Sequence, residues 1–241
     1  CSLLFSFHAN AQIFKKKAEP TTKKPAAKKP PKKGGIQPYK KVITKNAVSD
    51  EGLFTVHKVD GKYYFEIPNT VLEQEILVVS RIAGTIKGLN FGGAGMKSRP
   101  QQVIRWQRFE DKLLLRSVSY SSVATEDKPI YESVKNNNTE PIIKTFPIKA
   151  YNKDTSACII EMNALFTSDV PMIGALSSRQ RRTFGIRRLD TKRSMVNHIK
   201  AYPKNVEVRH TLTYDGTKLP DNVLTGALTL EMNQSFIVLP E

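Results

Sequence analysis

The sequence contains few of the residues that usually mark a metal centre, a disulfide scaffold or a membrane span. Its 241 residues include 2 cysteines and 4 histidines, too few for a disulfide framework or a four-cysteine zinc site. No apolar run approaches the roughly 18 residues that a membrane-crossing helix needs, so we expect no transmembrane segment. No HExxH, GxSxG or uninterrupted phosphate-binding loop is present. The commonest signatures of hydrolases and nucleotide-binding proteins are therefore missing.

The positive charge is concentrated near the N-terminus. The formal net charge is +16, and residues 12–45 hold 12 lysines against one glutamate, Glu19. Residues 46–241 hold 26 basic and 21 acidic residues, so the remainder of the chain is only mildly basic. The Lys/Pro-rich segment 12–38 has no apolar periodicity and predicts a disordered, extended linker. A spacer role is favoured over nucleic-acid binding, and attraction to an anionic surface stays open.

The first residues carry the pattern of an export signal. An apolar stretch, Ser2 to Phe7, is followed by Ala9-Asn10-Ala11, which matches the A-x-A rule of a signal-peptidase site. We therefore expect residues 1–11 to be a truncated signal peptide. The protein is then exported, to the periplasm, the outer membrane or the exterior. The alternatives are a chance hydrophobic terminus and a lipoprotein acceptor at Cys1.

Residues 39–241 predict a mainly β region, either a β-sandwich or an open barrel, with two or three short helices. Asp60-Gly61 separates two alternating runs, 54–59 and 62–67, as in a tight hairpin. The apolar run 75–82 is typical of a strand buried on both faces. In an alternative division of this region, residues 39–90 form a small separate subdomain. Further strands are expected at 103–108, 112–120, 142–151, 157–162, 206–214 and 227–239.

Three capping signals predict helices. Asp127 is expected to cap a short helix from Pro129 to Lys135. Asp190 is expected to cap a helix over 191–201, because Met195, Val196 and Ile199 would then share one face. Ser177 and Gln180 have the spacing of a capping box.

The titratable residues give little evidence of chemistry. His210 falls on the apolar side of its strand, where a hydrogen-bonded core histidine is expected, and His57 supports no specific role. Cys158 lies in an apolar strand and predicts a buried, inert thiol. The sequence therefore indicates no catalytic residue, no metal ligand and no cofactor site in this chain.

Two surface features remain as binding candidates. The stretch 179–193 has seven basic residues and one acid, so it could contact an anionic partner or be merely the solvated side of a helix pair. A glycine-rich stretch, 88–98, resembles a phosphate loop, but Met96 interrupts the pattern, which favours a surface or interdomain loop. The candidate contacts are Arg179, Arg181, Arg182, Arg187 and Arg188 for the partner, and Gly92, Gly93 and Gly95 for the loop.

Several long stretches resemble the N-terminal region of a family of large, secreted, zinc-dependent metalloproteases of Gram-negative bacteria. They are YKKVITKNAVSDEGLFTVHKVDGKYYFEIP (39–68), ILVVSRIAGTIKGLNFGGAGMKSRPQQVIRWQR (76–108), LLRSVSY (114–120), DVPMIGALS (169–177) and VEVRHTLTYDG (206–216).

The resemblance implies that zinc and the catalytic HExxHxxGxxH motif belong to a domain downstream of residue 241. This chain would be a non-catalytic accessory region, truncated at its C-terminus. Its partners would be that catalytic domain and the protein or peptide substrate of the parent protease, with no nucleic acid expected. The alternative is a basic binding module for an anionic surface or nucleic acid.

Overall fold

The computed structural model describes residues 35–89, 91, 95–220 and 226–239. The predicted signal peptide, nearly all of the predicted linker, and Gly92 and Gly93 of the glycine-rich loop lie outside these residues. Short α-helices are α1 (Tyr39–Val42), α2 (Tyr131–Asn137), α3 (Asn163–Phe166) and α4 (Ser178–Thr183), and single 3-10 turns are η1 (Asn69–Val71), η2 (Pro171–Ile173) and η3 (Thr191–Arg193).

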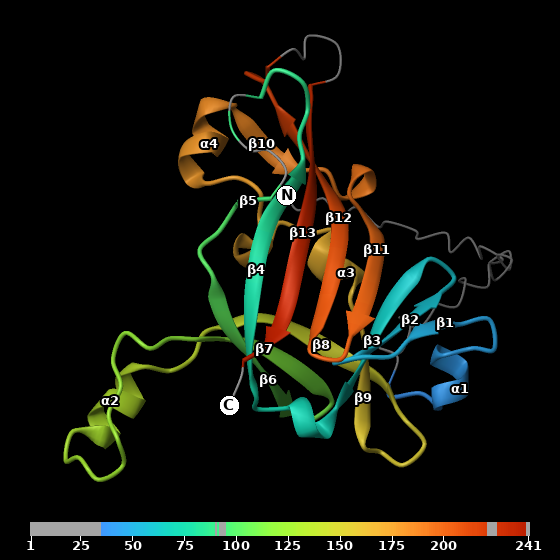
Figure 1. The fold of residues 1–241 in the computed structure, drawn as a ribbon, viewed down its shortest axis with the longest axis vertical. Helices are drawn as coiled ribbons and strands as arrows, with labels where there is room; N and C mark the ends of the chain where they lie inside the picture. The colour runs from blue at the N-terminus through green and yellow to red at the C-terminus, as the bar shows by residue number, and fades with distance from the viewer. Residues whose placement is uncertain (1–34, 90, 92–94, 221–225, 240–241) are drawn as a thin grey trace, which may run out of the picture. The chain divides into compact units, whose positions relative to one another are not determined.

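β-Strands are the main secondary structure of the described chain, and the helices are short, which confirms the mainly β prediction (Figure 1). The tight hairpin predicted at Asp60-Gly61 is confirmed, because these residues adopt φ values of 48° and 78°. A second tight turn joins residues 102–109 to 112–118, where Glu110 adopts a φ of 51°. The strands are β1 (Val48–Asp50), β2 (Thr55–Val59), β3 (Lys62–Pro68), β4 (Glu75–Gly84), β5 (Met96–Lys97), β6 (Gln102–Phe109), β7 (Lys112–Val118), β8 (Ile142–Tyr151), β9 (Ala157–Glu161), β10 (Ile186–Leu189), β11 (Met195–Tyr202), β12 (Asn205–Gly216) and β13 (Ala227–Val238).

The strands form one antiparallel sheet in the order β1-β2-β3-β9-β8-β7-β6-β4-β13-β12. Strands β10 and β11 both pair with β12, and β5 pairs with β4. Figure 1 shows β4, β13, β12 and β11 side by side. The sheet curls until its two ends almost meet, which selects the open-barrel alternative over the sandwich.

The two ends of the sheet are joined by a short seam between the β1–β2 connection and β11. The amide of Leu53 donates to the carbonyl of Tyr202 at 2.8 Å. The carboxylate of Asp50 accepts from the amide of Ala201 at 3.0 Å. Gly52 lies between them, and a Cβ at this position would come within 2.6 Å of the Tyr202 backbone. Glycine therefore permits the close approach that nearly closes the barrel.

Large apolar side chains fill the barrel. Trp106, Phe54, Phe65 and Phe236 are fully buried, and Trp106 packs edge-on against Phe146 with ring centroids 5.5 Å apart. Burying each such ring contributes about 1.5–3 kcal/mol relative to exposure. The interior is therefore a packed core.

A segment without strands also lies inside the core. Residues 162–177, which we call the internal segment, contain α3 and η2 and bury Leu165, Phe166, Ile173 and Leu176. The ring of Phe166 contacts those of His210 and Phe236, at centroid distances of 5.5 and 6.2 Å. Apolar burial thus holds this segment against the inner face of the sheet.

A row of three buried polar side chains crosses neighbouring strands and fixes the internal segment. Ser80 on β4 donates to Oε1 of Gln234 on β13. Gln234 in turn donates to Nε2 of His210 at 3.0 Å and to the carbonyl of Ile173 at 3.3 Å. His210 uses its Nδ1 to donate to the carbonyl of Phe166 at 2.8 Å. The row separates two apolar clusters. On each of the three strands, residues of one cluster lie on one side of the polar residue, and residues of the other cluster lie on its other side.

This row confirms that His210 is a hydrogen-bonded core residue. Burial lowers the pKa of His210 from 6.5 to about 4, so the ring is neutral at neutral pH. Cys158 is likewise fully buried, and burial raises the pKa of its thiol.

The helix predicted over 191–201 is wrong. Asp190 does cap a turn, because its carboxylate accepts from the amides of Lys192 and Arg193, but the turn is η3 and ends at Arg193. The chain then forms β11, which pairs with β12 and carries a bulge between Val196 and His198. The bulge adds one residue to the alternation, so Val196 and Ile199 stand three apart and imitate a helical spacing.

Of the other two capping signals, the one at Asp127 is wrong: a helix follows it, but Ile130 is the N-cap residue and no side chain caps this helix. The predicted helix 129–135 is displaced to α2, which begins at Tyr131. Ser177 and Gln180 form the expected capping box at the start of α4.

Candidate interaction surface

The arginines of the candidate binding stretch lie on α4 and β10, and not on a pair of helices. The capping box fixes the start of α4, since Ser177 accepts from the Gln180 amide at 3.2 Å and Gln180 accepts from the Ser177 amide at 2.7 Å. Arg179 and Arg182 on this helix are exposed. No ion pair among the described residues includes either of them.

Arg181 on the same helix faces the core and forms a bidentate ion pair. Its two Nη atoms donate to the carboxylate of Asp169 at 2.8 and 2.5 Å. The guanidinium also lies 5.2 Å from the ring centroid of Tyr214. The Asp169 hydrogen bonds raise the pKa of Arg181 further. Arg181 therefore ties α4 to the internal segment and to β12.

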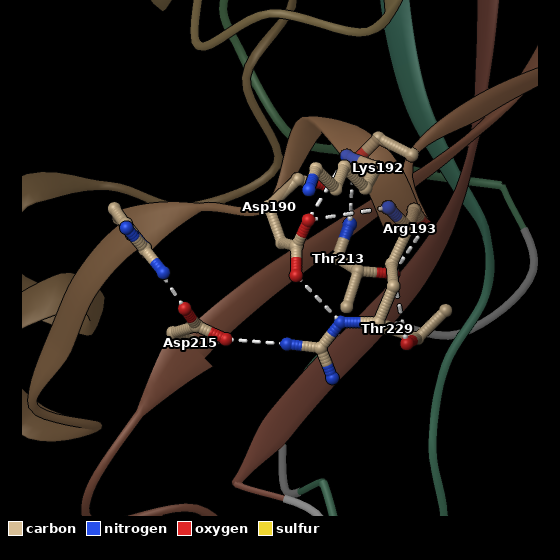
Figure 2. Close-up of polar contacts among 8 residues, drawn as sticks. Asp190, Lys192, Arg193, Thr213, Asp215 and Thr229 are labelled. Carbon is tan, nitrogen blue, oxygen red and sulfur yellow. Dashed lines mark hydrogen bonds and ion pairs between the residues drawn. The ribbon is translucent and has the colours of Figure 1, made fainter.

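Arg188 on β10 belongs to a second ion-pair network. Figure 2 shows Asp190, Arg193 and Asp215 of this network. Arg188 donates to Asp215 at 3.0 Å, and Arg193 bridges Asp215 and Asp190 at 2.5 and 2.7 Å. Thr213 adds hydrogen bonds to the Arg193 carbonyl and to Thr229. Because the Arg188 side chain is 78% exposed, this network adds little to stability and mainly orients η3 against β12.

The five predicted arginines thus divide into two groups. Arg181 and Arg188 are held by carboxylates, whereas Arg179, Arg182 and Arg187 are exposed and take part in no ion pair among residues 35–89, 91, 95–220 and 226–239. Only the second group has a charge free for a partner.

The glycine-rich loop reaches the same end of the sheet as α4. The ring of Phe91 packs against that of Phe184, which follows α4, at a centroid distance of 5.7 Å. Gly95 adopts φ 92°, and its amide donates to the carbonyl of Ile82 at 2.9 Å. The structure therefore brings the two binding candidates together, although Gly92 and Gly93 lie outside the described residues.

A pocket of about 500 Å³ opens beside α4. Arg99, which follows β5, lies in its wall and donates to the carbonyls of Pro171 at 2.9 Å and Leu176 at 2.6 Å. Burial, together with the nearby charge of Arg181, lowers the pKa of Arg99. The pocket is lined by Arg99, Asp169, Pro171, Leu176, Ser178 and Arg181. The sequence did not single out Arg99 or Asp169, which lie 70 residues apart.

Sequence reasoning also missed a polar chain on the outer face of β1, β2 and β3. Ser49 lies 2.7 Å from Nδ1 of His57, and Nε2 of His57 lies 3.0 Å from Glu66. Tyr39 donates to the same carboxylate at 3.0 Å, and burial with this bond raises its pKa to about 12. The hydrogen bond from His57 lowers the pKa of Glu66. Tyr39, but not Ser49, lines the neighbouring pocket. The hydrogen bond from Tyr39 to Glu66 attaches α1 to the sheet.

The described residues contain no group of three or more His, Cys, Asp or Glu side chains placed to hold a metal ion. The zinc that the resemblance implies therefore finds no donor set among them. In the described part of the chain, no helix has both the length and the apolarity to cross a bilayer.

The fold and the surface define a mainly β, nearly closed barrel with a filled interior and a basic end. Residues 95–241 match the domain of unknown function DUF5117, and residues 36–85 match the domain of unknown function DUF5118. The chain belongs to the DUF5117 family. No curated protein and no solved structure matches it.

The two matched segments share one sheet. Strand β4, in the first segment, pairs with β6 and β13, both in the second. The domain boundary expected near residue 90 stays a prediction.

Proposed function

We propose that this chain is the non-catalytic N-terminal accessory region of an exported, zinc-dependent metalloprotease. The filling of the barrel carries the proposal. Aromatic side chains and the internal segment occupy the space that a ligand-binding barrel would leave empty. The buried imidazole of His210 has both nitrogens committed to protein partners. Such a unit acts as a rigid scaffold for a neighbouring domain.

The sequence stretches that resemble the protease family support the same assignment. They include the β2–β3 hairpin, β4 with the loop that follows, and part of the internal segment. On this proposal the downstream domain supplies the zinc ligands and the general base. The barrel packs on that domain and shapes the approach of a protein or peptide substrate.

The test is expression of the full-length gene with and without residues 39–241. We expect the deletion to lose soluble, folded protease and its zinc-dependent peptidase activity. The 241-residue chain alone, supplied with zinc, should leave the same peptides intact. Unchanged folding and activity after the deletion would contradict the proposal.

The exposed arginines Arg179, Arg182 and Arg187 favour a second candidate, a module that binds an anionic surface or polymer. Such binding weakens with salt in proportion to the number of contacts. Affinity for single-stranded DNA or polyglutamate with a steep dependence on salt would support this candidate, and a flat dependence would exclude it.

A further inference from the structure

The pocket beside α4 has an unbalanced positive charge. Arg99, Arg181 and Asp169 are the charged residues in its lining, so its wall carries one net positive charge. Asp169 already binds both Nη atoms of Arg181. Arg99 has no carboxylate partner among the described residues and is held only by the carbonyls of Pro171 and Leu176.

The remaining donors of Arg99 are suited to a bound ligand. A guanidinium has five N–H groups, and the two carbonyls use two of them. Those two bonds fix the plane of the group, so a ligand would meet donors that are already oriented. A planar, oriented guanidinium matches a carboxylate with two parallel hydrogen bonds.

The charge and the size of the pocket favour a carboxylate on a peptide. A single carboxylate neutralises the wall, whereas a phosphate dianion would leave negative charge beside Asp169. Pro171 and Leu176 supply apolar surface for the atoms next to the carboxylate. The volume of about 500 Å³ is within the usual range of ligand sites, about 300–1,000 Å³.

We propose that the pocket formed by Arg99, Arg181, Pro171, Leu176 and Ser178 binds a carboxylate of an acidic peptide segment, with Arg99 as the principal contact. This site differs from the exposed arginines Arg179, Arg182 and Arg187, which lie outside its lining. It also stands apart from the proposed function, because the 241-residue chain alone would show the binding.

The test is an NMR titration of the full chain with acetyl-Ala-Glu-Ala-amide, using acetyl-Ala-Gln-Ala-amide and inorganic phosphate for comparison. Signals of the pocket identify the site and exclude binding to the Lys-rich segment. We expect saturable shifts at the Arg99 Nε–H and the Ser178 amide with the glutamate peptide only. Absence of these shifts, or equal shifts with phosphate, would overturn the proposal.

Two matched variants assign the effect to Arg99. Arg99→Gln should weaken peptide binding at least ten-fold. Arg182→Gln removes the same charge from the neighbouring exposed face and should change binding less than two-fold. Equal losses of affinity in the two variants would mean that the peptide is held by general electrostatic attraction, and would contradict the proposal.

A third variant guards against loss of structure in Arg99→Gln. Ser178→Glu places a carboxylate at the pocket while leaving both Arg99 carbonyl bonds in place, and an acid suits the first turn of a helix. We expect it to fold normally and to abolish the peptide-induced shifts. Undiminished binding in this variant would contradict the assignment.

Discussion

His210 shows how one buried side chain determines the course of a long segment. Its Nδ1–H must donate to the Phe166 carbonyl, so Nε2 is left as an acceptor for Gln234. A second proton on Nε2 would face the Gln234 amide group, which is itself a donor. The neutral ring is therefore the form that the core accommodates.

This arrangement predicts acid destabilisation through His210. The unfolded chain takes up a proton as pH falls below 6.5, whereas the folded chain does so only near pH 4. The contribution of the neutral His210 ring to the free energy of unfolding is therefore fully present above pH 6.5. It is lost as the pH falls to about 4, which lowers the free energy of unfolding by about 3 kcal/mol. Chemical unfolding at pH 7 and pH 4 should show a smaller loss in His210→Gln than in the native chain. An equal loss in both would contradict the assignment.

At the scale of the residue, the sequence predicts whether a side chain is buried better than it predicts its hydrogen-bond partners. Strand alternation placed His210 inside, and an apolar context buried Cys158. The partners of His210 lie 24 and 44 residues away, and their approach depends on the path of the internal segment. The same reason hid Arg99 and Asp169, because no local pattern encodes a contact between distant chain segments.

At the scale of the element, Ser177 and Asp190 located the start of a helical turn more reliably than they predicted its length. Ser177 and Asp190 both cap as predicted, yet only α4 continues for more than one turn. Pairing of β11 with β12 outweighed the helical spacing after Asp190. Strands β1 and β5 span three and two residues, too few to show any alternation.

The capping box of α4 gives a prediction at this scale. Ser177→Ala removes the acceptor of the Gln180 amide, so the free energy of unfolding should fall by about 1 kcal/mol. Ser178→Ala, one residue further and exposed, should change it by less than about 0.5 kcal/mol. Urea denaturation of both variants measures the difference. Equal stabilities would show that the box does not hold α4.

At the scale of the whole barrel, Gly52 controls the seam. Gly52→Ala would place a Cβ within 2.6–2.8 Å of three backbone atoms of Tyr202, which cannot rotate away. We expect a loss of about 1–3 kcal/mol in unfolding free energy, together with faster hydrogen exchange at the Leu53 amide. Gly35→Ala is the matched control, since nothing lies within 4 Å of its added Cβ. Slow exchange at Leu53 in Gly52→Ala would show that the seam tolerates the methyl group.

The pairing of β4 with β13 has a consequence for how the chain is made. Residues 75–84 are synthesised before their partner, residues 227–238, and Ser80 and Gln234 are 154 positions apart. Until that late strand arrives, β4 presents an unsatisfied edge that can recruit foreign strands. Bringing such distant segments together is slow. The barrel therefore cannot be completed until residues 227–238 have been synthesised, and during that interval the unpaired β4 is accessible to chaperones.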